Sequence, residues 1–200
     1  FRDIYVKIWE LIESTQDEGV KKTQKVISSI PDSAYRFQQR TVDIVDLYED
    51  AARAKQLFDP FLQNFETRLK EAGIRDAEVS NPVSLKKTSR VIEKCALDFS
   101  GTYGNHPEIR HFFKIGDIVR GLVACEKMSD IAVAIRELVD HPDIEIIRWK
   151  NRFARPSSGG WRDFLVCFFF RSDKQKHICE MQVAHTKMLK ARQGLGGHAI

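Results

Sequence analysis

The run "DFLVCFFF" at residues 163–170 is the feature that most restricts how this chain can fold. Seven consecutive apolar residues between polar turns are typical of a strand buried on both faces. The run is reached through a loop rich in arginine and lysine, "RWKNRFARPSSGGWR", and a second strand pattern follows at 176–185. We therefore predict a sheet with the strand at 161–170 in its interior and a basic loop at one end of that strand.

The strand predicted at 176–185 carries charged and amide side chains on one face only. Residues two apart in a strand share a face, so Ile178, Glu180 and Gln182 point the same way. The opposite face is the predicted core face, and it consists of His177, Cys179, Met181 and Val183. Glu180 and Gln182 are therefore expected to face a polar cleft.

Residues 76–200 alternate between strand and helix patterns. We predict strands over 114–125 and 143–153, a helix over 129–141 between them, and a closing helix over 186–197 that the end of the sequence truncates. A further helix is expected from near Pro82. The predicted fold class is α+β (mixed α/β), with a mixed β-sheet of about five strands flanked by helices.

Residues 1–75 have the pattern of an N-terminal helical region. Apolar residues recur at helical spacing over 1–13 and over 41–58. A third helix is predicted to begin with Asp59 as N-cap and Pro60 at its first position, and to end at Gly73. No residue of this region suggests chemistry, so we expect a layer that packs on the sheet or binds a partner.

Charge and cysteine content exclude several classes of protein. The 32 basic and 28 acidic residues give a net charge of +4, which suits an anionic ligand but not an obligate nucleic-acid binder. The four cysteines are isolated from one another, which favours reduced thiols in an intracellular, cytoplasmic protein over disulfides or a zinc site. No stretch is long enough for a membrane span, and no signal peptide opens the chain. The uncapped end "GLGGHAI" predicts a piece of a longer protein with flanking domains.

Two carboxylates and the basic loop predict a site for phosphates. Asp117 opens the strand at 114–125, where alternation would place it on the same face as Gly121; a glycine in a strand often marks close approach of a ligand or another backbone. If this strand neighbours the one at 176–185, Asp117 and Glu180 can hold one divalent ion. Basic residues that would neutralise phosphates are Arg148, Lys150, Arg152, Arg155 and Arg162. The alternative is that these bases form structural ion pairs with the two carboxylates.

The loop that leads into the strand at 161–170 contains an aromatic residue and a carboxylate of interest. Trp161 follows Gly159 and Gly160, and this setting favours a platform for a ligand over a core residue. Asp163 would either add a third carboxylate to the cleft or pair with Arg162 or Arg120.

Four segments together resemble the synthetase domain of the RelA/SpoT family, the alarmone synthetases of the nucleotidyltransferase superfamily. "DIVRG" at Asp117 is similar to the family's metal-binding D-x-x-G-x-R, and "EMQVAH" at Glu180 to its E-[IV]-Q-[IL]-R-T. "SGGWRDF" stands in place of N-G-Y-x-S-x-H, so the resemblance implies that Trp161 stacks on the acceptor base. "NPVSLKK" resembles the segment that handles the ATP phosphates, and "MLKARQGLGGH" resembles the family's last helix. The resemblance covers residues 78–198.

The chain departs from the family pattern at several polar positions. Glu78 and Ser80 replace an arginine and a lysine of the ATP segment, and the glycine and arginine of the aspartate motif become Arg120 and Leu122. Asp163 replaces the serine after the aromatic residue. Leu165 and His185 (or its neighbour Ala184) replace the family's histidine and threonine at the ends of these motifs. These changes predict a divergent member with another acceptor or with lost catalysis.

The resulting hypothesis is a transfer of a pyrophosphate or nucleotidyl group from ATP to a hydroxyl of a nucleotide or an RNA, with Mg²⁺ or Mn²⁺ as cofactor. Asp117 and Glu180 would be the catalytic and metal-binding residues. The predicted nucleotide- and phosphate-binding residues are Ser84, Lys87, Arg120, Lys150, Arg152, Trp161, Arg162 and Gln182. The alternative is an inactive nucleotide-sensing or protein-interaction module of a larger protein.

Overall fold

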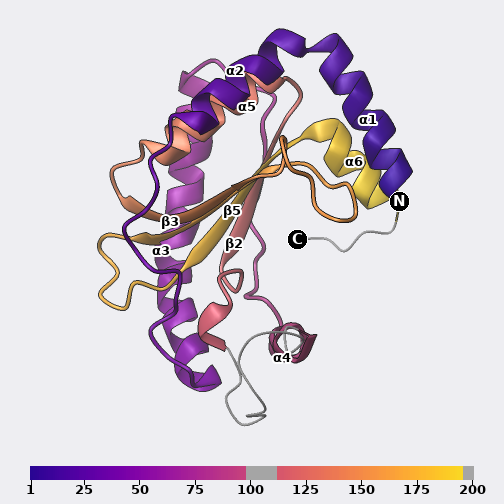
Figure 1. Cartoon of the computed structure of the whole chain (residues 1–200). Coiled ribbons are helices and arrows are strands. Elements are labelled where there is room, and N and C mark those ends of the chain that lie inside the picture. The colour runs from indigo at the N-terminus through magenta and orange to yellow at the C-terminus, as the bar shows by residue number, and fades with distance from the viewer. Residues whose placement is uncertain (98–111, 196–200) are drawn as a thin grey trace.

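The computed structural model describes residues 1–97 and 112–195, which form a five-stranded mixed sheet with helices around it (Figure 1). The helices are α1 (Arg2–Thr15), α2 (Asp17–Ser28), α3 (Ile44–Glu71), α4 (Thr88–Leu97), α5 (Met128–Val139) and α6 (Thr186–Gly194), with a short 3-10 helix η2 (Phe112–Lys114). The strands are β1 (Glu78–Ser80), β2 (Arg120–Cys125), β3 (Ile144–Asn151), β4 (Phe164–Phe170) and β5 (Cys179–His185). The predicted α+β class and the mixed sheet are confirmed.

The sheet has the order β1-β2-β5-β4-β3. β2 and β5 run parallel, and the other neighbouring pairs are antiparallel. The apolar run forms β4, which is buried at all seven positions and lies between β5 and β3. β2, which follows Asp117, and β5, which contains Glu180, are direct neighbours. A site shared by the two carboxylates requires this arrangement.

One face of the sheet is covered by α3 and α5 (Figure 1). Phe58 of α3 stacks on Phe168 of β4 at a centroid distance of 6.3 Å, and Phe61 contacts Phe168 and Phe170 at 5.6 and 5.4 Å. Aromatic pairs of this kind add about 1 kcal/mol each beyond the area that they bury. Buried residues of α1, α2 and α3 belong to the same core cluster as those of the sheet, and within it α2 packs along α5 and α1 along α6.

The prediction of a helix break at Asp59 and Pro60 is wrong, because α3 is one helix of 28 residues that contains Pro60. Asp59 does not cap a helix start; its carboxylate pairs with Lys55 one turn earlier and accepts a hydrogen bond from Asn81. A proline inside a helix removes one hydrogen bond and costs about 3 kcal/mol. The buried stripe of α3, which continues from Leu47 to Leu69, outweighs that cost.

The expected face of Asp117 is also wrong. β2 begins at Arg120 after a bend at residues 118–119, so strand alternation does not extend back to Asp117. Gly121 faces α3, where an added Cβ would lie 2.8 Å from Met181 Sδ and 3.1 Å from Phe58 Cζ. Side chains of the core, not a ligand, are therefore what approaches Gly121 closely.

Two further differences lie in the segment before β2. Residues 78–80 form a short edge strand, β1, that the pattern did not locate, and α4 begins at Thr88, six residues after Pro82. The edge strand is only three residues long, which is too short for an alternating pattern to be recognised.

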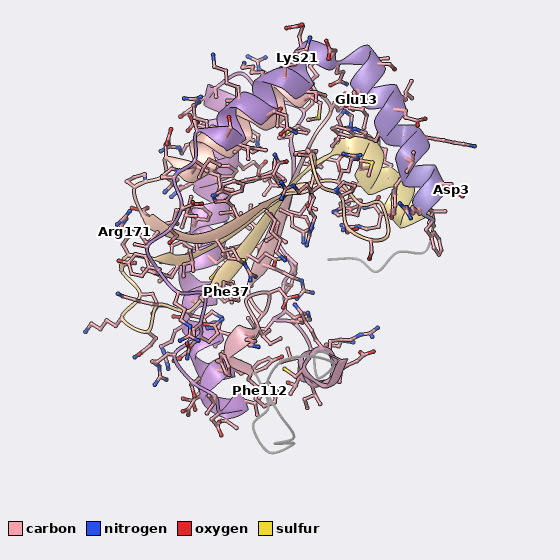
Figure 2. All side chains as sticks on the ribbon, in the orientation of Figure 1. Asp3, Glu13, Lys21, Phe37, Phe112 and Arg171 are labelled. Carbon is pink, nitrogen blue, oxygen red and sulfur yellow. The ribbon has the colours of Figure 1, made fainter. Side chains whose placement is uncertain are left out.

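The second face of the sheet carries polar side chains from β2, β5 and β3 together with two small apolar clusters. One cluster contains Leu165, Cys167 and Phe169 with Phe37 from the segment between α2 and α3, and the other contains Leu122, Ala124 and Ala184 with Leu189 (Figure 2 labels Phe37). Paired residues on adjacent strands project to the same side of a sheet. The register therefore places on this face the five residues that we call the polar band: Arg120, Arg148, Lys150, Glu180 and Gln182.

All four cysteines, Cys95, Cys125, Cys167 and Cys179, are reduced and buried, as predicted. None of the described helices is both long and apolar enough to cross a membrane.

Candidate functional site

Asp117 lies at the entrance to β2, and two lysines hold its carboxylate. Its Oδ2 accepts hydrogen bonds from Lys86 Nζ at 2.6 Å and from Lys94 Nζ at 3.1 Å. Its Oδ1 is buried and has no hydrogen-bond partner within the described ranges 1–97 and 112–195. Burial alone would raise the pKa of Asp117, but Lys94 and Lys86 outweigh it and hold that pKa below the ordinary value. The carboxylate is therefore ionised, and one of its oxygens has no hydrogen-bond partner among the described residues.

Glu180 lies beside the entrance to β2, on the parallel strand β5. Its backbone N–H donates to the carbonyl oxygen of Val119 at 3.0 Å, and its register partner is Arg120. Its Oε1 accepts a hydrogen bond from Gln182 Nε2 at 3.0 Å, as expected for two residues on one strand face. Burial raises the pKa of Glu180, and the negative charge of Asp117 raises it further. In the part of the chain that the structure describes, Glu180 forms no ion pair.

The alternative that both carboxylates pair with the predicted bases does not match this geometry. Asp117 pairs with Lys86 and Lys94, neither of which was among those bases. Within the described residues, the side chain of Glu180 is hydrogen-bonded to the amide of Gln182 and forms no ion pair. The polar band therefore contains a half-buried carboxylate without a direct salt bridge in that part of the chain.

β3 contributes a row of cations to the same face. The guanidinium of Arg148 lies over the ring of Phe37 at 3.6 Å, and Lys150 is exposed. Burial lowers the pKa of Lys150, and the charges of Arg148 and Arg152 lower it further. Cations that repel one another in this way favour the binding of an anion between them.

Trp161 and Asp163 occupy the loop before β4. The indole N–H of Trp161 donates to Asp163 Oδ2 at 2.8 Å, and Arg152 Nη1 donates to both oxygens of Asp163 at 3.2 and 3.3 Å. The guanidinium of Arg192 in α6 lies over the Trp161 ring at 4.3 Å. Asp163 therefore pairs with Arg152, and not with Arg162 or Arg120 as expected.

Three predicted site residues lie away from the two carboxylates. Arg162 donates to the carbonyl oxygen of Phe153, and its guanidinium lies over the ring of Trp9 in α1 at 4.7 Å. Ser84 is exposed in the turn after β1, and Lys87 is exposed directly before α4. Their roles in binding phosphates stay predictions. Arg120, in contrast, donates to the backbone oxygen of Asp117 at 3.3 Å and lies within the site.

Asp117 and Glu180 together fit a divalent ion that is only partly held by protein. No group of three or more histidine, cysteine or acidic side chains suited to a metal occurs among residues 1–97 and 112–195. Two carboxylates do meet there, and Asp117 Oδ1 is a buried oxygen without a hydrogen-bond partner in those residues. Mg²⁺ is usually bound by one or two carboxylates together with substrate phosphates and water. The residues therefore match an ion that arrives with a nucleotide.

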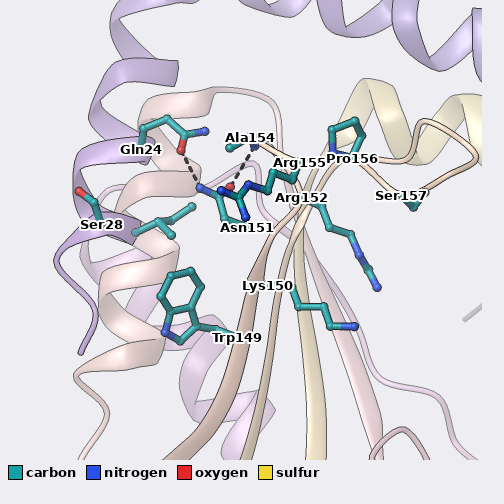
Figure 3. Close-up of a pocket in the computed structure, with 11 residues that line it drawn as sticks. Gln24, Ser28, Trp149, Lys150, Asn151, Arg152, Ala154, Arg155, Pro156 and Ser157 are labelled. Atoms are coloured by element: carbon teal, nitrogen blue, oxygen red, sulfur yellow. Dashed lines mark hydrogen bonds between the residues drawn. The ribbon is translucent and has the colours of Figure 1, made fainter. Parts of the chain in front are cut away.

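A separate cavity of about 620 Å³ lies between α2 and the edge strand β3 (Figure 3). Its walls include Gln24 and Ser28 of α2, Trp149 of β3, and Arg155 of the loop that follows. Lys150 and Arg152 also border it, but Asp117 and Glu180 do not. The cavity and the polar band therefore share Lys150 and are otherwise distinct.

The fold of this chain is similar to that of several solved structures, although its sequence is not close to a known family. No protein-family model and no curated protein matches the sequence. The structure is similar to the crystal structure of small alarmone synthetase 1 from Bacillus subtilis bound to its product pppGpp, with a TM-score of 0.55 and 14% identity over 74% of this chain and 79% of that chain. The chain has the fold of the small alarmone synthetases.

Two further solved structures share this fold. Small alarmone synthetase 2 from Bacillus subtilis matches with a TM-score of 0.52 and 16% identity, over 78% of this chain and 84% of that chain. A type VI effector, solved in complex with its immunity protein, matches with a TM-score of 0.50 and 18% identity, over 72% and 62% of the two chains. The alarmone synthetase fold therefore occurs both in synthetases and in an effector.

Sequence reasoning missed three residues of the site: Lys86, Lys94 and Arg192. Lys86 adjoins the predicted Lys87, so the segment was identified but the residue was not. Lys94 and Arg192 reach the site from α4 and α6, and their helical patterns contain no signal of what each helix packs against.

Proposed function

We propose that this chain transfers a pyrophosphate or nucleotidyl group from ATP to a hydroxyl group of a nucleotide or an RNA, with Mg²⁺ or Mn²⁺ as cofactor, inside the cell. The observation that carries the proposal is Glu180, a half-buried carboxylate beside Asp117 that forms no ion pair within the described residues. Such a charge is costly to keep in a fold unless a ligand or a reaction uses it. The pppGpp bound by one structure with this fold supports a nucleotide as the ligand.

Asp117 and four residues of the polar band have roles in the proposed reaction. Asp117 and Glu180 would hold the metal, which when bound neutralises charge on the phosphates of ATP. Arg120 and Lys150 would contact phosphate oxygens, and Gln182 would keep the carboxylate of Glu180 in place through its 3.0 Å hydrogen bond.

Glu180 would also accept the proton of the acceptor hydroxyl. A carboxylate placed beside the acceptor hydroxyl can act as its general base. If the hydroxyl oxygen attacks the β-phosphorus, the bond from the α–β bridging oxygen to that phosphorus breaks and AMP leaves. If it attacks the α-phosphorus, pyrophosphate leaves instead.

The two routes are separated by the position of a label. ATP labelled at the γ- or at the α-phosphate is incubated with Mg²⁺ or Mn²⁺ and with GDP, GTP, AMP, ADP or bulk tRNA. Transfer of the γ-label indicates pyrophosphate transfer, and transfer of the α-label indicates nucleotidyl transfer. Asp117→Asn and Glu180→Gln should each abolish transfer, whereas Glu137→Gln, which removes a carboxylate paired with Arg68 in the helical layer, should leave it unchanged.

A nucleotide-sensing or protein-interaction module without catalysis is the second candidate. It is favoured by Glu78 and Ser80, which stand where the resembling family has basic residues, and by the two lysines that already neutralise Asp117. Nucleotide binding by calorimetry, with no label transferred to any acceptor of the panel, would support this candidate and refute the transferase.

A further inference from the structure

Gln39 is a buried glutamine in the segment between α2 and α3. Residues 31–42 of this segment form neither helix nor strand, and we call them the strap. Gln39 is only 2% exposed, although it belongs to no regular element and has no role in the reaction described above. A buried amide is costly unless it is hydrogen-bonded, so the partners of Gln39 show what the strap is attached to.

The amide of Gln39 joins the two chain segments that lead into β2 and β5. Its Nε2 donates to the carbonyl oxygen of Ile115 at 2.7 Å and to that of Ile178 at 3.2 Å, and its Oε1 accepts a hydrogen bond from the Ile178 N–H at 3.0 Å. The backbone N–H of Gln39 donates to the carbonyl oxygen of Phe113 at 2.7 Å. The side chain therefore lies between the two segments as an inserted peptide group would.

These two segments carry the two carboxylates of the candidate site. Ile115 lies two residues before Asp117, and Ile178 lies two residues before Glu180. The parallel ladder of β2 and β5 has not yet begun at these positions, because its first register pair is Arg120 with Glu180. The inserted amide therefore takes the place of the ladder where the two segments lie apart.

A continued ladder would place Asp117 on the wrong face of the sheet. Extending the register of β2 and β5 backwards would pair Asp117 with His177, on the face that carries Gly121 and packs against α3. Glu180 projects from the opposite face. Asp117 instead lies close enough to Glu180 for its charge to raise the pKa of that carboxyl group. The two carboxylates meet because the segments separate before β2 begins.

The strap also packs against the segment that carries Asp117. A Cβ on Gly116 would lie 2.7 Å from Cζ of Phe37, so this ring of the strap covers the backbone directly before Asp117. The guanidinium of Arg148 lies over the same ring at 3.6 Å (Figure 2 labels Phe37). Hydrogen bonds and packing therefore both attach the strap to the entrance of β2.

We infer that Gln39 is a positioning residue: its amide fixes the separation of the segments before β2 and β5, so that Asp117 and Glu180 face one another as a metal-binding pair. This inference rests on the proposed function. Without the amide, the carbonyl groups of Ile115 and Ile178 and the Ile178 N–H would each lose a hydrogen bond. Loss of a group that orients metal ligands from outside typically weakens metal binding by about 10- to 100-fold.

The first test is the binding of Mn²⁺ with ATP, followed by electron paramagnetic resonance, because it does not depend on transfer. Gln39→Met keeps the length of the side chain and removes every hydrogen bond of its amide, so it should weaken Mn²⁺ binding about tenfold. Arg40→Met is the matched control. It also removes two hydrogen bonds from the strap, but they go to Asp50 in α3, so Mn²⁺ binding should be unchanged. Equal Mn²⁺ binding by Gln39→Met and the unmodified protein, or equal weakening in both variants, would overturn the inference.

The second test measures amide hydrogen exchange at the junction itself. The Ile178 N–H donates to Gln39, whereas the Glu180 N–H donates to the carbonyl oxygen of Val119 in the ladder. In Gln39→Met, the Ile178 amide should exchange about fivefold faster or more, the factor expected when one hydrogen bond is lost, while the rate at Glu180 is retained. An unchanged rate at Ile178, or equal acceleration at both amides, would overturn the local role of Gln39.

The inference and the proposed function fail in different ways. If the unmodified protein binds no Mn²⁺ with ATP, the proposed metal site is refuted, and the positioning role falls with it. If the unmodified protein binds Mn²⁺ and Gln39→Met binds it equally well, only the positioning role is refuted. Should Gln39→Met not fold, Gln39→Asn takes its place: it keeps the amide on a side chain shorter by one methylene, and the same loss of Mn²⁺ binding is expected.

Discussion

Replacing Glu180 with glutamine should make this protein more stable while removing its activity. Glutamine has nearly the same shape as glutamate, and its carbonyl oxygen can still accept the hydrogen bond from Gln182. What the substitution removes is a negative charge that burial and Asp117 both disfavour. Relief of a half-buried charge that forms no ion pair within the described residues should be worth about 1 kcal/mol. For a chain of this length, that gain corresponds to about 2–4 °C in Tm.

The pH dependence of this gain distinguishes the proposed cause from a general packing effect. The folded-state pKa of Glu180 lies above its unfolded value, so the cost of its charge is present at neutral pH and is lost as the pH falls through the folded-state pKa. The stabilisation by Glu180→Gln should therefore be full at pH 7–8 and should vanish near pH 4, where an ordinary glutamate is also protonated.

Urea unfolding at a series of pH values measures both quantities. Glu137→Gln is the matched control, because its carboxylate accepts two hydrogen bonds from Arg68, at 3.1 and 2.7 Å, and its removal should reduce stability slightly at neutral pH. A Glu180→Gln protein that is less stable than the unmodified chain at pH 7 would show that the charge of Glu180 is compensated in the fold. The argument for a carboxylate held ready for a cation would then be wrong.

Two further predictions concern the fold. Gly121→Ala should lower the free energy of unfolding by about 1–3 kcal/mol, because the added methyl overlaps core side chains at 2.8–3.1 Å. Gly159→Ala is the control: its Cβ would meet nothing nearer than 4.0 Å, so the free energy of unfolding should change by less than about 0.5 kcal/mol. Equal effects of the two substitutions in urea unfolding would contradict the packing of β2 against α3. Burial lowers the pKa of His177 from 6.5 to about 4, so the stability that its neutral form contributes is complete above pH 6.5. This stability is lost as the pH falls towards 4, by up to about 1.4 kcal/mol per pH unit. His177→Phe should flatten the pH dependence of the unfolding free energy over this range, and an unchanged slope would refute the role of His177.

The parts of the site that the sequence predicted depend on local periodicity. Glu180 and Gln182 were placed on one strand face because alternation by two residues is a property of the strand itself. Asp117 was correctly paired with the neighbouring strand but assigned the wrong face, because the bend at residues 118–119 leaves no pattern in the sequence. The rule for a proline at a helix start failed at Pro60, where a stripe of buried contacts along α3 outweighs one lost hydrogen bond. Lys94 reaches Asp117 only through the packing of α4, which is a tertiary property.

The central claim is that Asp117 and Glu180 hold a metal ion together with a nucleotide. It is tested most directly by the binding of Mn²⁺ with ATP, followed by electron paramagnetic resonance, because this measurement requires no knowledge of the acceptor. We expect one Mn²⁺ bound per chain in the presence of ATP, with binding weakened at least about tenfold in Asp117→Asn and unchanged in Glu137→Gln. Equal Mn²⁺ and ATP binding by the unmodified and Asp117→Asn proteins, both folded, would contradict it.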